Sequence, residues 1–276
     1  MKNLVITTCI NYSFEIFQRF IGSLFDSIDN VELVIFIGQE DINHILKLNN
    51  IYKNIKYFIV DNKNVHIVSF RFELYYDFLI KNKSNYQYIF MCDSRDVLFQ
   101  KDIFQHPIIS SNYDLYIFEE ESKHITIDKC QFNSLYVTRS ELPIESIVYN
   151  KPIICAGTIL GTEKGILRYL EKFNLILNNE IPENIKSLYG VDAGINYKII
   201  YNNLLNDINI YFSKNNEKLV YTMAFPIFLN IIDYNILLNK NKQICYDKDI
   251  CYCVHQYDRL NDIIKKNISV KYNYLL

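Results

Sequence analysis

The spacing of hydrophobic and polar residues alternates between two periods over the N-terminal part of the chain. Short apolar runs typical of buried strands cover residues 3–8, 31–37, 55–60 and 88–91. Between them, apolar residues recur every three or four positions over residues 14–28 and 65–81, which predicts two helices. This alternation of strands and helices predicts an α/β fold, in which helices flank a mixed, mostly parallel sheet.

The second half of the chain has a less regular pattern. Apolar runs predict strands at residues 115–118, 153–161, 219–223 and 251–255, and helical spacing covers residues 164–177 and 191–203. The sequence contains neither an internal repeat nor a linker rich in Gly, Ser or Pro. We therefore expect a single domain over residues 1–276.

Composition narrows the classes of protein. The chain is 50% hydrophobic and 15% aromatic, which is enough to build a large core. Its net charge of -2 provides no basic field, so we expect no nucleic-acid partner. No apolar run approaches the roughly 18 residues of a membrane span, and the run at residues 4–6 is too short for a signal peptide.

The seven cysteines show neither a zinc-binding nor a disulfide pattern. They include no CxxC pair, and most of them lie within apolar runs. We expect free, buried thiols in a reducing compartment.

Two carboxylates follow the apolar run at residues 88–91, in the segment Asp93-Ser94-Arg95-Asp96. Ligands of parallel sheets bind at the C-terminal ends of strands, and Mg²⁺ and Mn²⁺ prefer carboxylate oxygens. A metal held there can bridge a diphosphate. The segment is also compatible with a simple turn, in which Asp93 caps the next segment and Arg95 pairs with Asp96. The local pattern leaves both interpretations open.

His255 ends the apolar run at residues 251–255 and is followed closely by Asp258 and Arg259. A lone histidine is most often structural, but neutral imidazole is also a common metal ligand. The combination of a strand end with nearby Asp and Arg favours a functional histidine.

Three other positions are candidates with equally plausible structural roles. Gly157 and Gly161 flank a strand-like run and would let the backbone approach a ligand, although an ordinary core strand would look the same. Asp192 begins a helical segment and could simply cap it. Arg71 lies on the predicted helix before the fourth strand, where a solvated side chain is the default expectation.

Taken in order, these segments resemble glycosyltransferases of the GT-A fold. The similar subgroup has an Asp-x-Arg-Asp-Val-x-Phe-Gln motif, a small-residue strand that ends in Leu-Gly, an Asp-Gln-Gly-x-x-Asn-Tyr segment and a His-Gln-Tyr-Asp-Arg element. The corresponding segments here are residues 93–100, 155–161, 192–197 and 255–259. This chain departs from the pattern at Ala193, where the family often has Gln.

The resemblance implies a GT-A domain, with residues 1–105 as the nucleotide-binding half and residues 106–276 as the half that completes the acceptor and metal sites. It implies transfer of a sugar from a nucleotide-sugar donor, with UDP as the expected nucleotide and Mn²⁺ or Mg²⁺ as cofactor. The acceptor would be a glycan, a lipid-linked sugar or a protein side chain. Because no anchor resembling that of Golgi enzymes is apparent, we expect a cytoplasmic enzyme, either of the organism itself or in a host cell.

The resemblance also assigns roles to single residues. Asp96 and His255 would ligate the metal, and Asp93 would contact the donor ribose or reach the metal through water. Arg95 would approach the sugar or the diphosphate. Asp192 would orient the acceptor hydroxyl or act as its base. The stereochemical outcome, retention or inversion, stays open.

The remaining donor contacts would come from two regions. The end of the first strand would flank the base and ribose, where a tyrosine could stack on the base. Arg71 would approach the diphosphate, and Gly157 would admit the ligand. The residues implied in donor binding are therefore Thr7, Thr8, Asn11, Tyr12, Arg71, Asp93 and Gly157.

Two other functions compete with this interpretation. A metal-dependent phosphohydrolase could use Asp93 and Asp96, but such enzymes cluster further Asp and His residues. The remaining histidines, at positions 44, 66, 106 and 124, show no metal-like spacing. A GT-A-like module that binds a sugar nucleotide or glycan without turnover would be compatible with Ala193.

Overall fold

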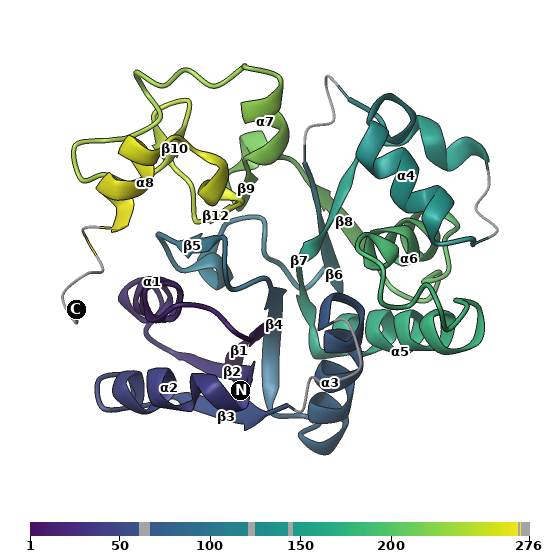
Figure 1. Ribbon diagram of the computed structural model, residues 1–276, viewed down its shortest axis with the longest axis horizontal. Coiled ribbons are helices and arrows are strands. Elements are labelled where there is room, and N and C mark those ends of the chain that lie inside the picture. The colour runs from purple at the N-terminus through teal and green to yellow at the C-terminus, as the bar shows by residue number, and fades with distance from the viewer. Residues whose placement is uncertain (61–66, 121–124, 143–145, 270, 272–276) are drawn as a thin grey trace.

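A seven-stranded sheet forms the centre of the computed structural model, which describes residues 1–60, 67–120, 125–142, 146–269 and 271 (Figure 1). The strand order is β3-β2-β1-β4-β7-β6-β8. The four N-terminal strands run parallel, β7 runs antiparallel to both of its neighbours, and β8 runs parallel to β6. The predicted fold class, a mixed and mostly parallel sheet flanked by helices, is therefore confirmed.

The strands of this sheet match the apolar runs closely. Their bounds are β1 (Lys2–Cys9), β2 (Val31–Ile37), β3 (Ile55–Ile59), β4 (Tyr86–Cys92), β6 (Leu115–Glu119), β7 (Ile154–Thr162) and β8 (Ile210–Ser213). All seven residues of β2 are buried, as expected for a strand that is covered on both faces of a sheet. The run at residues 210–213 was not predicted as a strand.

Helices cover both faces of the sheet. Their bounds are α1 (Phe14–Ser27), α2 (Ile42–Asn49), α3 (Ile67–Lys81), α4 (Gln131–Arg139), α5 (Glu163–Asn179), α6 (Val191–Tyr201), α7 (Ala224–Phe228) and α8 (Asp262–Ser269). Leu4 and Ile6 of β1 pack with the core that includes α3, α5 and α6. Val5 and Cys9 face the opposite core, which includes α1 and α2. The predicted helices at residues 14–28, 164–177 and 191–203 are confirmed. The helix predicted at residues 65–81 is observed as α3 from Ile67 onward, and residues 65 and 66 lie outside the described part.

A second, three-stranded sheet lies beyond the C-terminal end of β4. It has the order β5-β12-β9, with β5 (Val97–Phe99), β12 (Cys253–His255) and β9 (Val220–Thr222). A two-stranded pair, β10 (Cys245–Tyr246) and β11 (Asp249–Ile250), lies in the same part of the chain. Residues of α8 and of the short α7 segment pack with this small sheet in a third apolar core.

Two further expectations concern free, buried cysteines and the lack of a membrane-spanning segment. All seven cysteines are free and buried. Within the described ranges, no helix combines the length and the apolar character that crossing a membrane requires.

Candidate metal and ligand site

Asp93, Asp96 and His255 meet where the large and small sheets adjoin. Asp93 directly follows β4, and the chain then turns into β5, whose Val97 pairs with His255 of β12. His255 Nε2 lies 3.6 Å from Asp93 Oδ2 and 3.6 Å from Asp96 Oδ1. The backbone N–H of Gln256 donates to the carbonyl of Asp96 at 2.7 Å and fixes the two segments to each other.

His255 and Asp96 are buried, Asp93 is partly exposed, and their facing atoms contact one another at 3.6 Å, beyond hydrogen-bonding distance. His255 is 1% exposed and Asp96 is 4% exposed. Neither His255 Nε2 nor Asp96 Oδ1 has a hydrogen-bond partner. Buried polar atoms are normally satisfied, and a shared cation is one chemical way to satisfy this pair. Two carboxylates and one imidazole could hold a divalent cation such as Mg²⁺ or Mn²⁺.

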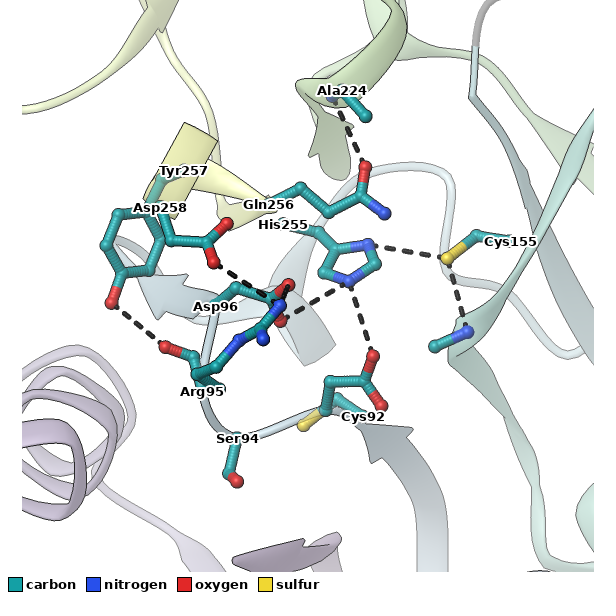
Figure 2. A network of polar contacts seen from close by, with 12 residues as sticks. Cys92, Ser94, Arg95, Asp96, Cys155, Ala224, His255, Gln256, Tyr257 and Asp258 are labelled. Carbon is teal, nitrogen blue, oxygen red and sulfur yellow. Dashed lines mark hydrogen bonds and ion pairs between the residues drawn. The ribbon is translucent and has the colours of Figure 1, made fainter. Parts of the chain in front are cut away.

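Cys155 and Gly157 of β7 shape the other side of His255. Figure 2 shows the His255 ring between Cys155 on one side and Asp96 on the other. Cys155 Sγ lies 3.3 Å from His255 Nδ1 and accepts a hydrogen bond from the Gly157 N–H at 3.2 Å. The contact at Nδ1 directs Nε2 toward the carboxylates. The role of Cys155 was not predicted.

Gly157 is required by the close packing of the trio. A Cβ atom at this position would lie 2.5 Å from Asp93 Oδ2 and 3.1 Å from His255 Cε1. The glycine therefore makes room for two candidate ligands. Gly157 also lines the cavity, and its role in admitting the donor stays a prediction.

Arg71 of α3 is buried between two carboxylates, so the solvated alternative is wrong, and its approach to a diphosphate stays a prediction. Its Nη1 binds Asp93 Oδ1, and its Nη2 lies 3.4 Å from Asp192 Oδ2. Burial alone would lower the pKa of Arg71, but Asp93, Tyr75 and Asp192 outweigh it and raise that pKa. Burial pushes the pKa of Asp93 upward, and Arg71 and His255 more than reverse this, so the pKa lies well below its usual range.

Asp192 has a different environment from Asp93. Burial raises its pKa to about 6, and the positive charge of Arg71 limits the rise. Asp192 lies in the first turn of α6, whereas the N-cap residue of that helix is Gly190. The capping role considered for Asp192 is therefore wrong, and its carboxylate lines the cavity described below.

Arg95 pairs with Asp96 as the turn interpretation predicted. Its Nη2 lies 3.3 Å from Asp96 Oδ2 and 3.3 Å from Asp258 Oδ2. The hydroxyl of Tyr257 donates to the Arg95 carbonyl at 3.3 Å, and Figure 2 shows these contacts beside the histidine. Because Asp96 binds Arg95 through Oδ2 and faces His255 through Oδ1, the turn and the candidate ligand set coexist.

The trio opens onto a cavity of about 630 Å³, a size suited to a small-molecule ligand. Most of the residues that the sequence singled out line it. They are Thr8, Tyr12, Arg71, Asp93, Arg95, Asp96, Gly157, Asp192 and His255. Thr7 and Asn11 are not among the lining residues. Thr7 is buried and donates to the Cys92 carbonyl at 2.7 Å, while the Asn11 N–H binds Asp41 Oδ2 at 2.9 Å.

Several lining residues were not singled out. They are aromatic or polar side chains from α4, from the segment before α6 and from the neighbourhood of β6 and β12, and include Glu120, Phe132, Tyr136, Tyr189, Gln256 and Arg259. Gln256 and Arg259 belong to the segment 255–259 that the sequence singles out for His255, but the sequence assigns them no role of their own.

The two other described histidines, His44 and His106, do not line the cavity. His44 packs against Phe14 and Phe17, and His106 Nε2 lies 3.0 Å from the Glu217 carbonyl. His66 and His124 lie outside the described residues. Within the described part of the chain, Asp93, Asp96 and His255 are the one group of three or more such side chains placed to share a metal ion.

No family model matches the chain, and no curated protein matches it significantly.

Proposed function

We propose that this chain is a metal-dependent glycosyltransferase of the GT-A type, which uses a nucleotide-sugar donor with UDP as the expected nucleotide. The observation that carries the proposal is the meeting of Asp93, Asp96 and His255 in one cavity. His255 lies more than 150 residues from the two aspartates in sequence. The three side chains meet at the C-terminal end of the parallel strand β4, where α/β sheets bind ligands.

The donor fits on the side of the cavity formed by Tyr12 and Arg95. Arg95 is half-exposed, and its guanidinium can donate to diphosphate oxygens while it stays paired with Asp96. Tyr12 lines the same cavity and can stack on the base. When bound, a divalent cation at the trio would offset the charge that develops on the leaving diphosphate. Arg71, already paired twice, holds Asp93 and Asp192 in place.

Asp192 is the residue that we assign to the acceptor hydroxyl. Its pKa of about 6 lies near neutral pH, so the carboxylate can accept a hydrogen bond or a proton from a hydroxyl group. Arg71 fixes its orientation through Oδ2.

The test is release of nucleoside diphosphate from nucleotide sugars, measured with MnCl₂ and with EDTA. We expect turnover that requires Mn²⁺ and falls at least about 100-fold in Asp96→Asn, which exceeds the usual effect of outer-shell changes. Asp207→Asn is the matched control, because Asp207 is exposed, pairs with Arg168 on the surface and does not line the cavity. Equal turnover in both variants would remove Asp96 from the site.

Binding without turnover would identify a different function. A sugar nucleotide at a hundredfold excess over its dissociation constant should stabilise the protein by about 2.7 kcal/mol. A thermal shift with UDP-sugars and Mn²⁺, without any release of UDP, would favour the non-catalytic module. Hydrolysis of p-nitrophenyl phosphate that depends on Asp93 and Asp96 would favour the phosphohydrolase.

A further inference from the structure

We propose that Phe132, Tyr136 and Tyr189, which we call the aromatic wall, bind a pyranose ring of the acceptor. The inference rests on the proposed transferase function and narrows its acceptor to a carbohydrate. Phe132 and Tyr136 belong to α4, and Tyr189 precedes α6. All three line the same cavity as the Asp93, Asp96 and His255 trio.

The aromatic wall offers apolar surface to the solvent within this cavity. Phe132 is 63% exposed and Tyr189 is 57% exposed. Exposed aromatic surface is unfavourable in water, and its concentration in a concave site that also holds charged groups is typical of ligand binding.

Two of the three side chains of the wall, Tyr136 and Tyr189, are held in place by local contacts. Tyr136 and Tyr189 pack edge to face, with ring centroids 5.5 Å apart. Arg139 Nη1 donates to the Tyr189 carbonyl at 2.7 Å. Gly190 has φ +91°, and a Cβ atom there would collide with the Tyr136 ring. The two tyrosines are therefore preorganised, which lowers the entropy cost of binding.

A short series of contacts connects the wall to the candidate metal site. Tyr189 and Gly190 lead directly into the first turn of α6, which carries Asp192. Asp192 contacts Arg71, and Arg71 contacts Asp93. In Figure 1, α4 and α6 lie on one side of β7, and β12 lies on the other. A sugar ring on the wall would thus place a hydroxyl near Asp192.

The chemistry of the lining favours a pyranose over a peptide or an acyl chain. Aromatic faces carry negative charge density and attract the C–H groups on one face of a sugar ring. Glu120 and Arg259 line the same cavity and can accept from and donate to hydroxyl groups. An acyl chain would have to desolvate these charged side chains without giving them partners.

The experiment is saturation-transfer-difference NMR on the full chain, without metal or donor. The probes are methyl β-glucopyranoside, methyl β-galactopyranoside, methyl α-mannopyranoside, octyl β-glucopyranoside and an unglycosylated Ser/Thr-rich peptide. We expect transfer to the ring C–H protons of at least one methyl glycoside. Phe132→Ala and Tyr189→Ala should each weaken binding by about 2- to 10-fold, as expected for loss of one stacking contact.

Phe228→Ala is the matched control. Phe228 is 73% exposed but does not line the cavity, so its loss should leave binding unchanged. Circular dichroism confirms that each variant is folded. No transfer to any methyl glycoside, equal loss in all three variants, or binding of the peptide alone would overturn the proposal. Saturation transfer only to the octyl chain of octyl β-glucopyranoside would likewise overturn the proposal. Saturation transfer to its sugar ring would extend the proposal to lipid-linked sugars.

This measurement separates the two proposals. Because no donor or metal is present, sugar binding to the wall can be observed even if nucleotide sugars are not turned over. Conversely, Mn²⁺-dependent release of nucleoside diphosphate by wild type, with no methyl glycoside bound, would leave the transferase proposal standing and refute the aromatic wall.

Discussion

Gly157→Ala is a small change that acts directly on the candidate metal ligands. The added Cβ would lie 2.5 Å from Asp93 Oδ2 and 3.1 Å from His255 Cε1, both shorter than normal van der Waals contact. Asp93 cannot simply turn aside, because Arg71 binds its other oxygen. The methyl group must therefore move the carboxylate, the histidine or the strand.

The magnitude follows from the cost of overpacking. Inserting a methyl group into a closely packed site costs about 1–3 kcal/mol. If that cost falls on the arrangement of the ligands, Mn²⁺ affinity drops by about 5- to 150-fold. We expect the lower part of this range if the strand shifts and shares the strain.

Gly161→Ala on the same strand supplies the control. Its Cβ would lie 2.5 Å from the backbone oxygen of Asp114, so it is crowded to a similar degree. Gly161 does not line the cavity, and its strand partners are Ile89 and Leu115. This variant should lose stability without losing affinity for Mn²⁺.

Isothermal titration of MnCl₂ into each folded variant measures the affinity, and urea denaturation without metal measures the stability. We expect weaker Mn²⁺ binding in Gly157→Ala and wild-type Mn²⁺ affinity in Gly161→Ala. Wild-type affinity in a folded Gly157→Ala protein, or an equal loss of affinity in Gly161→Ala, would refute it.

Variants at three further positions test the surroundings of the site and the stability of the fold. Arg71→Met leaves two carboxylates without their cation and should lower the free energy of unfolding, measured in urea, by about 3–5 kcal/mol. A loss below about 1 kcal/mol would contradict the view that Arg71 is needed to offset the two carboxylate charges. Cys155→Ala removes the partner of His255 Nδ1 and should weaken Mn²⁺ binding, measured by calorimetry, by about 10- to 100-fold. Cys155→Ser should bind Mn²⁺ with an affinity closer to that of wild type. Unchanged affinity in both variants would exclude a positioning role for Cys155. Burial lowers the pKa of His106 from 6.5, so the unfolded chain binds a proton that the native state does not. The contribution of neutral His106 to the free energy of unfolding should therefore be complete above about pH 6.5. It should be lost as the pH falls below that value. Urea denaturation should show a smaller fall in His106→Gln, and equal falls would contradict this sign.

The N-terminal half of the fold could be predicted because its signals are local. The inner strands there, β1, β2 and β4, are largely buried and appear as apolar runs, most clearly in β2, whereas the edge strand β3 is mostly exposed. The missed elements carry weaker patterns. β5 has three residues, and α4 buries mainly Asn133 and Val137, so its apolar spacing is faint.

The site could be predicted only in part, for the same physical reason. Asp93 and Asp96 lie in one short segment after a strand, where a local pattern can reveal them. His255 was singled out by its neighbours and by resemblance, because nothing in the sequence measures its distance from Asp96. The contact of Cys155 with His255 depends on how β7 lies beside β12, and the burial of Arg71 depends on two carboxylates distant in sequence.

Thr7 illustrates the limit of reasoning from strand ends. It lies near the C-terminal end of β1, where ligand contacts are expected, yet it is fully buried. Its hydroxyl binds the Cys92 carbonyl and so supports the strand that carries Asp93. Position along a strand predicts proximity to a site, but which face a side chain occupies decides whether it lines the cavity.

The central claim is that Asp93, Asp96 and His255 hold a divalent cation beside a nucleotide diphosphate. Anomalous diffraction from crystals soaked with MnCl₂ and UDP tests this most directly. We predict one strong manganese peak in contact with Asp96 and His255, with the diphosphate of UDP on its open side. A bound UDP with no manganese at this trio, or manganese and UDP bound only elsewhere on the protein, would contradict the claim.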